Sequence, residues 1–198
     1  MNKVITISRQ FGSGGRTIGK KVAEILGVPC YDQEIIERVA QESGFAKEYI
    51  AEHGEYKPYG SWFGNALSSV NASIGGISNS DMLWITQRKV ILDLAAQGPC
   101  VFVGRCADYI LRGKADLLKV FIYADMAERA KRIVEVYGET DEAPEKRLKS
   151  KDKRRAAYYK FYTETEWGVA KHYTVCLNSG EIGLDKCAEI IVDLYKNK

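Results

Sequence analysis

The chain has 198 residues, of which 28% are charged, and its formal net charge is +3. This length suits one domain of ordinary size, and the mild charge argues against a nucleic-acid coat while allowing local basic clusters that bind small anions. The five cysteines are Cys30, Cys100, Cys106, Cys176 and Cys187. They form no C-x-x-C pair and have no neighbouring histidines, so we expect reduced thiols rather than a zinc site or a disulfide framework.

The N-terminal segment lacks the apolar region of a signal peptide, and no apolar run approaches the length of a membrane span. We therefore expect a cytoplasmic protein with neither membrane nor nucleic-acid partners. The sequence carries no signal for a particular oligomeric state.

The first predicted elements are a strand, a glycine-rich loop and a helix. Lys3–Ser8 (KVITIS) is β-branched and apolar, as in a buried central strand. From Thr17 the apolar positions follow helical spacing, and Gly27 can end this helix. A short second strand is predicted over Val28–Asp32, followed by a helix over Gln33–Ser43.

The rest of the chain alternates helices and strands after one irregular segment. That segment, Gly44–Ser80, is rich in Gly, Ser, Asn and aromatic residues and has weak periodicity, which is typical of a functional insertion. The later predicted elements are a helix over 81–97, a strand over 99–105, a short helix over 106–113, a strand over 117–125, a helix over 126–137, a basic helix over 144–161, a strand over 173–178 and a helix over 185–195. This alternation predicts an α/β fold with a five-stranded parallel sheet flanked by helices.

The glycine-rich loop lies within ITISRQFGSGGRTIGKK, residues 5–21. Gly12, Gly14 and Gly15 would let backbone N–H groups converge on one anion, and the following helix would point its positive end at the same place. The hydroxyl of Thr17 could then reach a Mg²⁺ ion. The strict P-loop pattern has a lysine directly after its last glycine, where this chain has Arg16. From these residues alone, a phosphate-binding loop and a tight packing turn are both possible.

RQFGSGGRT resembles the phosphate loop of nucleoside monophosphate kinases, cytidylate kinase in particular, which reads G-x-x-G-x-G-K-G-T. Arg9 replaces the first glycine of that pattern, and Gly15 replaces its lysine. The resemblance implies that Arg16 stands in for the lysine and that Thr17 binds the metal. The residues that it implies for binding the phosphates of ATP are Arg9, Gly12, Ser13, Gly14, Gly15, Arg16 and Thr17.

Two further segments resemble the family's acceptor site. YDQEIIERV places Asp32 and Arg38 where the family has an aspartate that opens this site and an arginine that grips the acceptor phosphate. VFVGRCADYIL makes Arg105 a further phosphate ligand, and Asp108 a substitute for the family's aspartate, whose place Cys106 takes. Without the resemblance, Asp32 also suits a helix N-cap, and both arginines suit solvated positions.

The segments YADMAERAKRI and KSKDKRRAAYY resemble the helix before the family's mobile lid and the lid motif R-D-x-x-R. Arg129 and Arg132 are one helical turn apart and can face one site. Lys151 and Arg155 match the two ends of the lid motif. The implied catalytic residues are Arg16, Arg129, Arg132, Lys151 and Arg155. The alternative for the lid residues is a charged, solvated helix face.

The resemblance covers nearly the whole chain and implies a three-layer P-loop NTPase-type fold in a single domain. Its core would be 1–43, 81–140 and 170–198, with an acceptor-side insertion at about 44–80 and a basic lid at about 141–169. It implies ATP as co-substrate, Mg²⁺ as cofactor, and phosphoryl transfer to a small phosphorylated acceptor, such as CMP or dCMP. The alternatives are a nucleotide-binding sensor with little or no catalysis and a kinase for another small acceptor. Four aromatic residues of the insertion could stack on a base or form a satellite core, namely Tyr56, Tyr59, Trp62 and Phe63.

Overall fold

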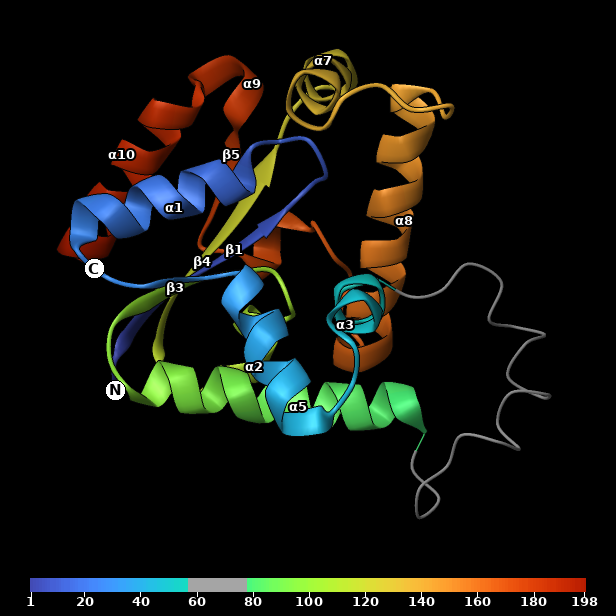
Figure 1. The fold of residues 1–198 in the computed structure, drawn as a ribbon. Helices are drawn as coiled ribbons and strands as arrows, with labels where there is room; N and C mark the ends of the chain where they lie inside the picture. Colours follow the sequence, from blue (N-terminus) through green and yellow to red (C-terminus); the bar gives the residue numbers. More distant parts are fainter. Residues whose placement is uncertain (57–77) are drawn as a thin grey trace.

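The computed structural model describes residues 1–56 and 78–198 and contains a parallel sheet covered by helices on both faces (Figure 1). The five strands are β1 (Lys3–Arg9), β2 (Cys30–Tyr31), β3 (Cys100–Val103), β4 (Asp116–Tyr123) and β5 (Val175–Asn178). They pair in the order β2-β3-β1-β4-β5, and every pairing is parallel. The predicted α/β class and five-stranded parallel sheet are thus confirmed. Tyr59, Trp62 and Phe63 lie outside the described residues.

The described helices follow the predicted order closely. They are α1 (Gly15–Leu26), α2 (Gln33–Ser43), α3 (Lys47–His53), α5 (Asn79–Ala96), α6 (Ala107–Ile110), α7 (Met126–Tyr137), α8 (Pro144–Thr163), the 3₁₀ helix η1 (Ala170–His172), α9 (Ser179–Ile182) and α10 (Leu184–Asn197). Gly27 ends α1 with a φ of +65°, as predicted. At the start of α5 the Ser78 hydroxyl accepts a hydrogen bond from the backbone N–H of Asp81 at 3.1 Å and so caps the helix.

The strands read as continuous apolar runs because both faces of the sheet are buried. Ile5 and Ile7 of β1 pack with α1 and α10, whereas Val4, on the opposite face, belongs to the core formed with α2 and α5. Figure 1 shows α1 and α10 together on one side of the sheet and α2 and α5 on the other. Two separate cores therefore hold the central strand in place.

The sequence analysis missed the short helices α3, η1 and α9, of which α3 matters most for the site. The segment with weak periodicity contains α3, which packs on α2 and carries the fully buried Ile50. Seven residues with one fully buried side chain give too few repeats for helical periodicity to be recognised. This helix places the residues that follow it, Glu55 and Tyr56, against the body of the domain.

All strands end at the same edge of the sheet, where ligands of open α/β folds bind. Arg9 is the last residue of β1, Asp32 follows β2, and Gly104 follows β3. Figure 1 shows this edge facing α7 and α8.

The sequence also led to expectations about the cysteines and about membrane-spanning segments. All five cysteines are free. In the described part of the chain, none of the helices combines the length and the apolar character needed to cross a bilayer.

Candidate functional site

The loop between β1 and α1 has a backbone that requires its glycines. Gly12 and Gly14 have φ values of +81° and +76°. A Cβ atom on Gly14 would lie 2.5 Å from Leu184 Cδ2, and one on Gly12 would lie 2.9 Å from the carbonyl oxygen of Arg129. A Cβ atom on Gly15 would lie 2.6 Å from Arg9 Cβ. Residues of α7, α10 and β1 thus pack directly on the loop backbone, and a side chain at these positions would displace them.

Hydrogen bonds at Ser13 hold the loop in place, while the N-terminal end of α1 remains uncapped by side chains. The buried Ser13 hydroxyl lies 2.9 Å from the carbonyl oxygen of Gln10, and the Ser179 hydroxyl donates to the carbonyl oxygen of Ser13 at 2.6 Å. Within α1, the N-cap residue Gly14 provides no side-chain cap, and the first turn contains no acidic residue. The first N–H groups of α1 and its positive dipole end are therefore available to an anion.

Helix α7 brings two of the predicted arginines to this loop. Arg132 Nη2 donates to the hydroxyl of Thr17 at 3.0 Å. The side chain of Arg129 is buried, and its Nη1 donates to the carbonyl oxygen of Phe11 at 3.2 Å and to Asp152 Oδ2 at 2.6 Å. The other oxygen of Asp152 accepts from the backbone N–H of Phe11 at 2.7 Å. Asp152 therefore fastens α8 to the start of the loop.

A cavity of about 200 Å³ opens beside the loop, between α7 and the turn from α9 to α10. Its lining residues are Gly12, Ser13, Ala124, Glu128, Lys131, Arg132, Glu135, Ser179, Gly180, Gly183 and Leu184. The loop and Arg132 thus form one wall of a space that is large enough for part of a small ligand.

A second group of side chains lies at the ends of β1 and β3. Three arginines, Arg9, Arg105 and Arg155, surround the carboxylate of Glu55, and we call these four residues the arginine cluster. Each of the four is between 5% and 8% exposed. Arg9 forms an ion pair with Glu55 through both guanidinium ends, one of them with an Nη2–Oε2 distance of 3.0 Å. Arg155 Nη2 lies 3.5 Å from Glu55 Oε2, and its Nη1 donates to the carbonyl oxygen of Arg9 at 3.1 Å.

The backbone around Arg105 is adapted to this cluster. Arg105 and Cys106 have φ values of +61° and +54°, which L-residues rarely adopt and which cost roughly 1–2 kcal/mol each. Arg105 Nη1 donates to the carbonyl oxygen of Ile50 and to Gln87 Oε1, both at 3.2 Å. A Cβ atom on Gly104 would overlap Arg9 Nη1 and Glu55 Oε1. The strained turn thus directs the guanidinium group of Arg105 inward, and Gly104 leaves space for the guanidinium group of Arg9.

The cluster has a surplus of positive charge. Burial by itself would raise the pKa of the Glu55 carboxyl, but the charges of Arg9, Arg155 and Arg105 outweigh this effect and lower the pKa to about 2. One ionised carboxylate faces three guanidinium groups. A cavity of about 20 Å³ remains within the cluster, lined also by Tyr158 and Trp167. Among the residues that the structure describes, the buried Nε of Arg155 has no hydrogen-bond partner.

The predicted substitute for the loop lysine points elsewhere. Arg16 is exposed, and its Nε forms an ion pair with the carboxylate of Asp32. Asp32 stands at the N-cap position of α2, as one alternative expected, but its side chain makes no capping hydrogen bond to that helix. The residue predicted for the donor phosphates and the residue predicted for the acceptor are therefore joined to each other.

The two other predicted acceptor residues lie apart from the cluster in the described contacts. The side chain of Arg38 is 39% exposed and lies 3.8 Å from Glu34 on the same helix. Asp108 is buried and accepts a hydrogen bond from the hydroxyl of Tyr159 at 2.7 Å. Its burial raises the pKa of the Asp108 carboxyl above its usual value.

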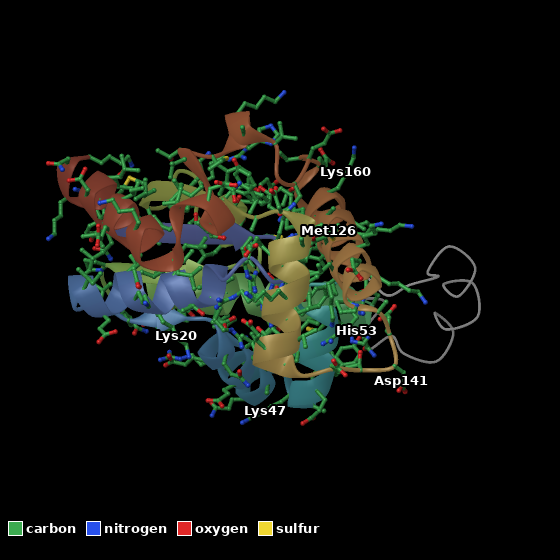
Figure 2. All side chains as sticks on the ribbon, turned by 90° about the horizontal axis from the view of Figure 1, so that it is seen from above. Lys20, Lys47, His53, Met126, Asp141 and Lys160 are labelled. Atoms are coloured by element: carbon green, nitrogen blue, oxygen red, sulfur yellow. The ribbon has the colours of Figure 1, made fainter. Side chains whose placement is uncertain are left out.

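Lys151 approaches the cluster through Tyr56. Its Nζ atom lies 4.8 Å from the centre of the Tyr56 ring, and the guanidinium carbons of Arg154 and Arg155 each lie 5.2 Å from the same ring centre. The hydroxyl of Tyr56 accepts from Arg155 Nη2 at 2.7 Å. Figure 2 shows the described side chains of the whole chain from above, with Met126 at the start of α7, Lys160 on α8 and His53 at the end of α3. Tyr56 thus lies among cations.

One residue of the cluster, Glu55, and one partner of the cluster, Gln87, were missed by the sequence analysis. Glu55 and Gln87 match no motif, and Glu55 lies in the segment with weak periodicity. The one signal that could have indicated Glu55 is general: buried arginines need a carboxylate partner. The chain has 26 acidic residues, and their spacing does not indicate which of them supplies it. In the described residues, no group of three or more His, Cys, Asp and Glu side chains is arranged to hold a metal.

Several known proteins resemble this chain in sequence or in fold. The model of the "Cytidylate kinase-like family" matches residues 4–181. A cytidylate kinase of Archaeoglobus fulgidus is 28% identical over 199 residues, covering 98% of this chain and 95% of that protein. Among solved structures, an uncharacterized protein from Eubacterium ventriosum has a TM-score of 0.74 at 26% identity, with 98% and 99% of the two chains covered. Shikimate kinase from Acinetobacter baumannii, solved with shikimate, has a TM-score of 0.55 at 14% identity over 100% of this chain and 94% of that one, and shares the fold.

Proposed function

The chain belongs to the cytidylate kinase-like family, and from this membership we propose that it transfers the γ-phosphoryl group of ATP to a small phosphorylated acceptor, with CMP or dCMP as the first candidates. The observation that carries the proposal is the arginine cluster beside the glycine loop. Three buried guanidinium groups against one carboxylate give a site with surplus positive charge. A phosphate dianion has the charge and the oxygen acceptors that such a site lacks.

The two parts of the site match the two substrates of such a reaction. In this proposal the residues Gly12–Thr17 bind the ATP phosphates through backbone N–H groups, and the cavity of about 200 Å³ receives the rest of the nucleotide. Arg132, which already contacts the loop, neutralises charge on the transferring group. Arg105 binds the acceptor phosphate, as expected from the sequence. Arg9, expected at the ATP phosphates, and Arg155, expected in the lid, join it there in this proposal, because both lie against Glu55. Because the acceptor is itself an anion, positioning and charge compensation supply most of the catalysis.

The remaining predicted residues are proposed to act around these two parts. Asp32 and Arg38 would orient the acceptor from the start of α2. Asp108 would support the acceptor site from its buried position beside Tyr159. Arg129 and Lys151 would act with the lid, about 141–169, when it closes over the reaction. Arg129 is already fixed by Asp152, so we propose that it positions α8 rather than moving with it.

The loop provides one oxygen ligand for Mg²⁺. The hydroxyl of Thr17 lies in the first turn of α1 and accepts a hydrogen bond from Arg132. Mg²⁺ in kinases is held by substrate phosphates and water together with one or two protein oxygens, so a single hydroxyl at this place fits the ion. When bound, the ion would neutralise charge on the ATP phosphates.

One observation favours a second candidate function. Arg16, the proposed substitute for the loop lysine, is paired with Asp32 instead of lying over the loop. If this pair persists when ATP binds, the loop would lack its closest cation, and the chain would act as a nucleotide-binding sensor with little or no catalysis.

ATP consumption decides between these two functions. The purified chain is incubated with ATP and Mg²⁺ and, in separate reactions, with each nucleoside monophosphate and with shikimate. We expect turnover to be fastest with CMP or dCMP. Fastest turnover with shikimate would establish a different acceptor, whereas ATP binding without turnover on any acceptor would favour the sensor.

The placement of Arg105 is tested separately. We expect Arg105→Ala to raise the KM for the acceptor about tenfold and to leave the KM for ATP unchanged, because the loop does not contact this side chain. Arg88→Ala, at an exposed position next to Gln87 on α5, is the matched control. Equal losses for both substrates would show that Arg105 does not belong to the acceptor site.

A further inference from the structure

The carboxylate at the centre of the arginine cluster comes from outside the sheet. Arg9 ends β1, Arg105 follows β3, and Arg155 belongs to α8, so the three arginines are carried by elements of the kinase fold. Glu55 comes two residues after the end of α3, a helix that packs mainly on α2. The positive part of the cluster and its negative part are therefore supplied by different regions of the chain.

The carboxylate leaves the positive charge only partly compensated. Arg9, Arg105 and Arg155 carry three charges in a region where each residue is at most 8% exposed, and Glu55 offsets one of them. Arg155 Nη2 also donates to the hydroxyl of Tyr56, while its buried Nε lacks a partner in the described part of the chain. Buried charges and donors of this kind are costly unless an anion satisfies them.

We propose that Glu55 is an internal occupant of an anion site, and that the phosphate group of the acceptor displaces its carboxylate when it binds. The inference rests on the proposed function and adds to it a built-in competitor. Glu55 stabilises the arginines while the site is empty of substrate. An acceptor binds only if its phosphate interacts with these arginines more favourably than the Glu55 carboxylate does.

Phosphate and Glu55 cannot occupy the cluster together. The cavity that remains beside the carboxylate is about 20 Å³, which is space for about one water molecule. A phosphate dianion offers three oxygens and two charges, against two oxygens and one charge for the carboxylate, and planar guanidinium groups bind both in the same forked manner. A dianion can therefore replace Glu55, whereas an uncharged acceptor cannot. Selection for phosphorylated acceptors follows from this exchange.

The test measures phosphate binding to the full chain without ATP. If Glu55 fills the site about nine-tenths of the time, Glu55→Gln should tighten the Kd of inorganic phosphate about tenfold in calorimetry. Thermal unfolding gives a second readout. Phosphate should raise the Tm of Glu55→Gln more than that of the unmodified chain, because it binds the cluster of the variant more tightly. Phosphate bound at the glycine loop raises the Tm of both chains equally and does not affect the difference. Sodium chloride at equal ionic strength corrects for general screening.

Matched variants separate this exchange from other effects. Asp185→Asn removes an exposed partner of Lys21 and should leave phosphate binding unchanged. Glu55→Gln combined with Arg105→Ala should lose the gain in phosphate affinity. If Glu55→Gln does not fold, Glu55→Asp keeps the charge but withdraws it by one methylene, and should show a smaller gain in the same direction.

Three results would overturn the inference. Unchanged or weaker phosphate binding by Glu55→Gln, or by Glu55→Asp in its place, would mean that Glu55 only holds the arginines in position. An equal gain with acetate would assign the site to carboxylates. A gain that persists after Arg105→Ala would place the phosphate elsewhere. None of these readouts requires turnover, so the proposed kinase activity can fail or succeed independently.

Discussion

The glycine loop and the arginine cluster lie side by side at the carboxyl edge of the sheet but are built in opposite ways. The loop presents backbone N–H groups and lies beside a cavity of about 200 Å³. The cluster consists of side chains from β1, the segment after α3, the turn after β3, and α8, and leaves about 20 Å³. One site is open in the absence of substrate, whereas the other is closed by its own carboxylate.

The difference follows from the cost of leaving each kind of group without a ligand. Backbone N–H groups at an accessible helix end can be hydrated, so the loop needs no internal anion. Buried guanidinium groups have no comparable access to water, and they require a partner from the chain. A site made of buried arginines therefore carries a substitute for its ligand.

The largest effect is expected from a change that breaks the loop alone. Gly12→Ala should weaken ATP binding about a hundredfold, because its Cβ atom would press on the backbone carbonyl oxygen of Arg129, which cannot turn aside as a side chain can. Gly27→Ala is the control, since Gly27 also has a positive φ but would place its Cβ atom in open space. We expect this control to lose about 1 kcal/mol of stability and no ATP affinity in calorimetry. Equal ATP affinity in the two variants would contradict the account of the loop.

A smaller effect is expected where the two regions are joined. Asp152 holds Arg129 and the backbone of Phe11, and Arg155 of the cluster follows three residues later on α8. Asp152→Asn should lower the free energy of unfolding by about 2 kcal/mol, because Arg129 keeps its charge in a buried position. Asp185→Asn, in an exposed ion pair, should change it by less than about 1 kcal/mol. If urea unfolding shows the same small loss for both, Asp152 does not couple the regions.

The smallest effect is the dependence of the cluster on pH. The pKa of Glu55 falls from 4.5 to about 2 on folding, so its contribution is complete above about pH 4.5 and is lost as the pH falls toward 2. The stability difference between the unmodified chain and Glu55→Gln should therefore shrink by about 1–2 kcal/mol between pH 5 and pH 3. Urea unfolding at both pH values measures it. A constant difference would show that Arg9, Arg105 and Arg155 do not hold the carboxylate in its ionised form.

The sequence predicted most of the fold because its signals are local. The apolar runs of the strands, the helical spacing after Thr17 and the stop at Gly27 each depend on neighbouring residues. The missed helices α3, η1 and α9 are the exceptions, since seven or fewer residues give little periodicity. The strand order β2-β3-β1-β4-β5 depends on long crossovers and could be specified only through resemblance to a known family.

For the candidate site, the sequence by itself determined the glycine loop, because positive φ values are a property of single residues and their spacing. Only the tertiary structure decided which side chains meet in the arginine cluster. Arg9 contacts Glu55 across 46 positions and Arg155 across 146. Such contacts depend on charge compensation within a packed interior, which the sequence does not display. Glu55, one of 26 acidic residues, is the partner of the arginines because α3 brings it to the ends of the strands.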